Sequence, residues 1–131
     1  MNAAPDRLRL RLDVPERVRA GEPVAVVIRV ENVGDSPLEL YLRGRTIAFD
    51  VIVSSAAGLP VWRRLYGEIV PAILRLETMA PGATLELVHG WDQRTNEGDA
   101  VAPGVYGVRG ELLTDAEPLV TPASVLVIVP G

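Results

Sequence analysis

The stretch VAVVIRVENVGDSPLELYL, residues 24–42, decides the fold of this chain. Apolar residues recur at every second position on both sides of a central NVGDSP segment, residues 32–37. A period of two is typical of β-strands with one buried face, and Asn, Gly, Asp, Ser and Pro are turn formers. The stretch is therefore predicted to form two strands joined by a reversal of the chain.

The same alternation continues on either side of this stretch. It predicts further strands near residues 8–12, 47–53, 61–63, 73–78, 84–91, 105–114 and 123–129. The connections are short and rich in turn residues, and no strand–helix–strand pattern occurs, so we expect about eight or nine antiparallel strands in a two-layer sandwich. The best helix candidate, residues 66–79, is disfavoured by Gly67 and Pro71.

Composition narrows the class of protein. The 131 residues suit one domain over residues 1–131. Cysteine is absent and all thirteen basic residues are arginines, which excludes disulfides, thiolate nucleophiles and lysine Schiff bases. The net charge of −4 gives no general attraction to nucleic acid or to an anionic membrane. We therefore expect neither of these partners and no cofactor.

Location and assembly are less constrained by the sequence. Residues 1–14 carry charges and a proline instead of an apolar signal core, so a cytoplasmic location is expected. A leader removed earlier would leave no trace. The run from Val125 to Val129 is apolar on both faces, which suits either a central strand or pairing with another copy of the chain. The oligomeric state is open, with a monomer favoured.

Two Pro-Gly pairs, Pro81-Gly82 and Pro103-Gly104, each precede a predicted strand. A type II turn requires a residue with φ of about −60°, such as proline, followed by one that tolerates positive φ, such as glycine. A turn is therefore predicted at each pair. Tyr106 follows the second pair on the inward row of its strand. Its hydroxyl is placed to bond an upstream backbone group, as in the corner of immunoglobulin-like folds, although a plain core aromatic fits as well.

Four segments, taken in order, resemble the bacterial intracellular proteinase inhibitor family known as BsuPI. They are VENVGDSPL at residues 30–38, residues 47–63 ending in GLPVWR, MAPG at residues 79–82, and residues 91–106 from WD to VAPGVY. The resemblance covers roughly residues 20–114. It implies an immunoglobulin-like antiparallel β-sandwich that inhibits an intracellular subtilisin-type serine protease by protein–protein binding through its loops. The alternative is a non-enzymatic immunoglobulin-like interaction or structural module.

Catalysis is not expected of this sequence. His89 is the only histidine, and it shares a strand face with Leu85, Leu87 and Trp91. No G-x-S-x-G elbow is present, so a structural role for His89 is favoured over a serine triad. The stripe of Arg7, Arg9 and Arg11 is interpreted as a solvated or edge-guarding face.

A metal site is not expected either. The loop at residues 92–99 carries four oxygen-bearing side chains that could meet calcium, but their spacing differs from the EF-hand template. A solvated polar loop is favoured over a calcium site. The four residues are Asp92, Asn96, Glu97 and Asp99.

Binding to a partner protein is assigned to two loops. Aromatic and arginine side chains are enriched in binding hot spots, and one short run concentrates both types. Leu65 or Tyr66 would suit a subtilisin-type specificity pocket, and Arg63 or Arg64 a trypsin-like one. Alternatively, Trp62 fills the sandwich core and the arginines end a strand. The candidate partner-binding residues are Trp62, Arg63, Arg64, Leu65 and Tyr66, with Arg94 in the neighbouring loop.

Overall fold

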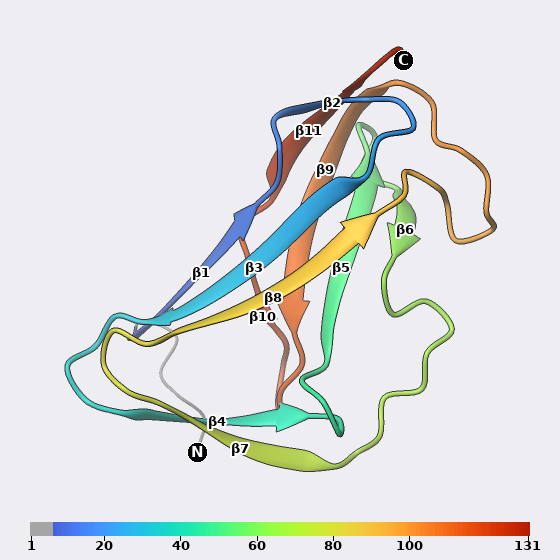
Figure 1. The fold of residues 1–131 in the computed structure, drawn as a ribbon. Coiled ribbons are helices and arrows are strands. Elements are labelled where there is room, and N and C mark those ends of the chain that lie inside the picture. The colour runs from blue at the N-terminus through green and yellow to red at the C-terminus, as the bar shows by residue number, and fades with distance from the viewer. Residues whose placement is uncertain (1–6) are drawn as a thin grey trace.

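The computed structural model describes residues 7–131, which form a two-layer β-sandwich (Figure 1). Three strands form one layer in the order β1-β3-β8, and the other layer has the order β2-β11-β9-β5-β6, with β10 added beside β9. Among the strands of residues 7–131, only the β2–β11 pair is parallel; the other pairs are antiparallel. The strands are β1 (Leu8–Asp13), β2 (Arg17–Arg19), β3 (Val24–Asn32), β4 (Leu38–Arg43), β5 (Phe49–Ser55), β6 (Pro60–Arg63), β7 (Leu74–Met79), β8 (Thr84–Trp91), β9 (Gly104–Leu112), β10 (Leu119–Val120) and β11 (Ser124–Val129).

The remaining pair, β4–β7, continues the β3–β8 pair around a bend at the lower end of Figure 1. Asn32 holds this bend and is fully buried. Its Nδ2 donates to the carbonyls of Ser36 at 2.9 Å and Met79 at 3.0 Å, and its Oδ1 accepts from the Gly34 amide at 2.9 Å. The side chain thus supplies hydrogen bonds that the strands cannot make at the bend.

Alternate residues of each strand fill the space between the layers. Val24, Val26, Ile28 and Val30 on β3 are at most 1% exposed, as the period of two predicts. The inward rows of β5, β9 and β11 meet them to form one apolar core. The Tyr106 hydroxyl donates to the Ala102 carbonyl at 2.5 Å, which confirms the predicted corner.

Other details of the strand prediction are corrected by the structure. There are eleven strands in residues 7–131 instead of eight or nine, because β2 and β10 are additional. The β-turn hydrogen bond from the Ala83 amide to the Ala80 carbonyl, 2.9 Å, closes the first Pro-Gly pair. The second pair forms no such turn, since Gly104 is the first residue of β9 with a φ of 154°. The disfavoured helix candidate is a turn at residues 64–67 followed later by β7.

The positions of β1 and β11 answer two of the sequence questions. β1 is an edge strand, and its exposed Arg9 and Arg11 lie 4.0 and 3.9 Å from Glu31 of β3, so these arginines belong to a solvated face. β11 lies between β2 and β9, which makes the run from Val125 to Val129 a central strand. Among residues 7–131, no helix has the length and hydropathy to cross a membrane.

Candidate functional site

The predicted binding residues lie at one end of the sandwich. Trp62 and Arg63 end β6, an edge strand of the larger sheet, and residues 64–67 form the turn that follows. Arg94 lies in the adjacent loop between β8 and β9, where its Nη1 donates to the Gly98 carbonyl at 2.9 Å. The structure therefore places both predicted loops beside β6, with different roles for the individual side chains.

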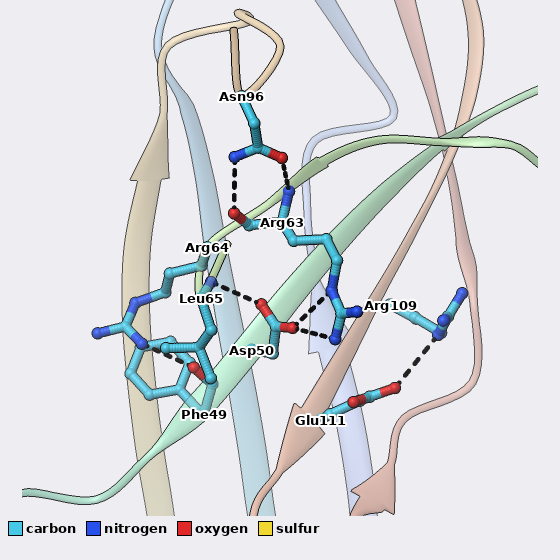
Figure 2. Close-up of polar contacts among 8 residues, drawn as sticks. All are labelled: Phe49, Asp50, Arg63, Arg64, Leu65, Asn96, Arg109 and Glu111. Carbon is cyan, nitrogen blue, oxygen red and sulfur yellow. Dashed lines mark hydrogen bonds and ion pairs between the residues drawn. The ribbon is translucent and has the colours of Figure 1, made fainter. Parts of the chain in front are cut away.

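Asp50 anchors the start of the 64–73 loop, the segment between β6 and β7 (Figure 2). Its side chain on β5 is 1% exposed. Arg63 Nε and Nη2 donate to Asp50 Oδ2 at 2.9 and 2.6 Å, and the Leu65 amide donates to Oδ1 at 3.0 Å. A buried carboxylate is costly unless such donors surround it, so Asp50 fixes the Arg63 side chain and the Leu65 backbone together.

Asn96 fixes the same segment from the other side. In Figure 2 its side-chain amide faces the Arg63 backbone, with Nδ2 donating to the Arg63 carbonyl and Oδ1 accepting from the Arg63 amide, both at 2.9 Å. This pairing imitates a neighbouring strand on the open edge of β6. The 92–101 loop is thereby docked on β6, and the Asn96 oxygen is committed to the Arg63 amide.

The other oxygen-bearing side chains of this loop form no cation cage. Asp92 Oδ1 accepts from the Arg94 amide at 3.2 Å, an Asx-type loop contact. Among residues 7–131, no three His, Cys, Asp or Glu side chains gather as metal ligands would. The geometry is that of a hydrogen-bonded polar loop.

Arg64 points to the side opposite Arg63 (Figure 2). Its Nη1 donates to the Phe49 carbonyl at 2.6 Å, and its guanidinium carbon lies 3.8 Å from the centroid of the Phe49 ring. The hydrogen bond and the cation–π contact fix the plane of the guanidinium. Of the two arginines suggested for a trypsin-like pocket, one is thus held by Asp50 and the other by Phe49.

Trp62 and His89 close the gap between the edges of the two sheets. Their rings stack at 5.5 Å between centroids with an interplanar angle of 16°, and Trp91 lies 5.8 Å from Trp62. Burial is the main cause that lowers the pKa of His89, the charge of Arg64 lowers it further, and Asp92 opposes both. Trp62 is partly buried against the core, in line with the structural alternative for this residue.

The tip of the 64–73 loop is exposed. Tyr66 is 64% exposed and Ile69 is 92% exposed. Below the tip, the Tyr66 amide donates to the Arg63 carbonyl at 3.3 Å, and the Glu68 amide donates to the Leu65 carbonyl at 3.0 Å. The loop is thus held at its base and presents apolar side chains to solvent.

Asp50 and Ile69 were not among the sequence-derived candidates, and Asn96 was considered only as a calcium ligand. The sequence does contain a signal for Asp50. It is the one charged residue in the apolar run from Ile47 to Val53, and Ile52, the next residue on its face of the strand, is apolar too. Such a residue must be covered and therefore needs a partner. Asn96 carries no comparable signal, since its role depends on the meeting of two distant loops.

No protein-family model and no curated protein sequence matches the chain. Solved structures share its fold at low identity. An alkylpurine DNA glycosylase AlkC from Pseudomonas fluorescens matches with a TM-score of 0.52 and 16% identity over 93% of this chain. A β-glucosidase from Listeria innocua matches with a TM-score of 0.50 and 12% identity over 95% of this chain. The chain spans only 30% and 16% of these two proteins. The CARDB domain of the PF1109 protein from Pyrococcus furiosus matches with a TM-score of 0.48 and 13% identity, and the match covers 93% of this chain and 87% of that domain's chain.

Topology and likeness together define the class. The chain is an all-β, immunoglobulin-like β-sandwich with a tyrosine corner. A fold of this kind hosts many functions, so function must be argued from the site itself.

Proposed function

We propose that this sandwich is a protein-binding module that inhibits an intracellular subtilisin-type serine protease through the 64–73 loop. The observation that carries the proposal is a contrast within the loop. Hydrogen bonds to Asp50 hold its base, whereas Tyr66 and Ile69 at its tip are 64% and 92% exposed. The resemblance of residues 20–114 to the BsuPI proteinase inhibitors supports the same assignment.

A loop that blocks a protease must hold its shape before binding, since ordering it at the interface costs affinity. The contacts of Asp50 with Arg63 and Leu65 supply that order. In the run Arg63–Tyr66, Tyr66 combines a well-exposed side chain with an aromatic ring. Such a ring suits an apolar specificity pocket. Ile69 extends the apolar contact along the loop.

A titration tests the proposal. A fixed concentration of a subtilisin-type protease is titrated with the purified chain, and hydrolysis of a short peptide substrate is followed. We expect hydrolysis to fall in proportion to added chain until the protease is saturated. Tyr66→Ala should weaken inhibition at least about tenfold, as for a hot-spot aromatic. Val88→Ala is the matched control, because Val88 is also 64% exposed but lies on the outer face of β8.

Undiminished hydrolysis at a large molar excess of the chain would reject the inhibitor assignment. The alternative, an immunoglobulin-like interaction or structural module without catalytic activity, would then take its place. Co-purification from the native cell separates the two, since the inhibitor recovers a protease and the structural module recovers an assembly partner.

A further inference from the structure

A pocket of about 410 Å³ lies between the turn at residues 44–48 and the 64–73 loop, with His89 in its lining. Volumes in this range hold small ligands. One part of the wall is apolar and is formed by Ile47, Ala48, Leu65, Ile69, Val70 and Pro71. Two arginines, Arg45 and Arg64, also line the pocket and give it a polar side.

The charges of these arginines are not neutralised by any ion pair in the part of the chain that the structure describes. The sole carboxylate side chain in the wall is Glu68, which is exposed, so the lining keeps an excess of positive charge in a chain whose net charge is −4. The position therefore favours an anion.

Arg64 is already oriented for such a ligand. Its Nη1 donates to the Phe49 carbonyl, and the Phe49 ring covers one face of the guanidinium. The remaining N–H groups of this oriented guanidinium are available to a ligand. A guanidinium of fixed orientation is well suited to the planar oxygens of a carboxylate. The apolar wall beside it suits a hydrocarbon stem.

We propose that this pocket binds a carboxylate carried on a short apolar stem, with Arg64 as the main anion-binding residue and Arg45 as the second. The carboxylate comes either from a small carboxylic acid or from the carboxyl terminus of a peptide with an apolar last residue. This site shares Ile69 with the proposed inhibitory contact, but Tyr66, the main residue of that contact, does not line the pocket.

The test is a binding titration of the full chain followed by amide chemical shifts in solution NMR. Four probes are used in two matched pairs: 4-methylpentanoate with 4-methylpentanamide, and N-acetyl-Leu-Leu with its C-terminal amide. We expect both acids to shift the amides of residues 44–48 and 64–70, and each amide partner to bind at least about tenfold more weakly. The tighter of the two acids identifies the source of the carboxylate.

Arg64→Gln is expected to weaken binding of the tighter acid at least about tenfold, and Arg45→Gln to weaken it less. Arg45 is exposed, so its variant keeps the test valid if Arg64→Gln unfolds. Arg9→Gln, on the outer face of β1, and Tyr66→Ala should bind like the parent chain. Equal binding of acid and amide, no shift with either acid, or full binding by both pocket variants would overturn the inference. No protease enters this experiment, so its outcome is independent of the inhibition titration.

Discussion

At the scale of single residues, the end of the sandwich that carries the proposed binding loop depends on Asp50. A carboxylate with 1% exposure survives in a sheet because three N–H groups of Arg63 and Leu65 surround it. The same contacts define where the 64–73 loop begins. One buried side chain thereby links the stability of β5 to the shape of the loop.

Asp50→Ala should lower the free energy of unfolding by about 2 kcal/mol, because it leaves the Leu65 amide and the Arg63 guanidinium without their acceptor. Arg63 is half exposed and can turn to water, which limits the loss. Urea denaturation measures the change. Glu86→Ala is the control, since it removes a 2.6 Å ion pair to Arg29 from an exposed face and should cost less than about 1 kcal/mol. Equal losses in the two variants would contradict the anchor role.

His89 predicts a pH dependence of stability. Its pKa in the folded chain is below the ordinary value of 6.5, mainly because of burial, so the unfolded chain takes up a proton first as the pH falls. Unfolding is then favoured progressively from about pH 6.5 down to the folded pKa. Urea denaturation at pH 7.5 and 5.5 should show lower stability at the lower pH, and His89→Gln should reduce this difference. An NMR titration of the ring that gave a pKa above 6.5 would refute the mechanism.

At the scale of elements, β9 brings the two sheets together at a glycine. A Cβ on Gly110 would lie 2.4 Å from Cδ1 of Ile28, a fully buried residue of β3. A Cβ on Gly107 of the same strand would meet no atom within 4 Å. The absence of a side chain at residue 110 is therefore required by the packing of β9 against β3.

Gly110→Ala should lower the free energy of unfolding by about 2 kcal/mol, since the core must shift to accept the methyl group. Gly107→Ala should leave stability unchanged or raise it slightly, because alanine loses less backbone entropy in a strand. Thermal unfolding of both variants checks the contrast. A Gly110→Ala variant as stable as the parent would show that β9 and β3 are further apart than the 2.4 Å contact at this position requires.

The elements also show what sequence reasoning can reach. Long strands such as β3 were predicted correctly because alternation over nine residues reports a buried face directly. β2 and β10 have three and two residues and exist through pairing with β11 and β9, which no local pattern reports. The run from Trp62 to Tyr66 is a binding candidate on residue types alone, and that prediction stays untested. Its division into anchors and an exposed tip depends on Asp50 and Asn96, which distant parts of the chain bring to it.

At the scale of the whole molecule, the sandwich supports a loop whose two ends are held by different elements. Asp50 on β5 and Asn96 beyond β8 fix the first end, and the hydrogen bond from the Gly44 amide to the Ile73 carbonyl, 2.8 Å, holds the second. The frame thus limits the freedom of the loop without covering its tip. This arrangement is the physical basis of the proposed inhibition.

Hydrogen exchange of the chain, alone and with a subtilisin-type protease whose nucleophilic serine is replaced by alanine, tests this account most directly. We expect the backbone amides of residues 64–73 to exchange more slowly when the protease is added. The amides of β1, β3 and β8 should exchange at an unchanged rate. Slowing confined to those three strands, or no slowing anywhere at saturating protease, would contradict the account.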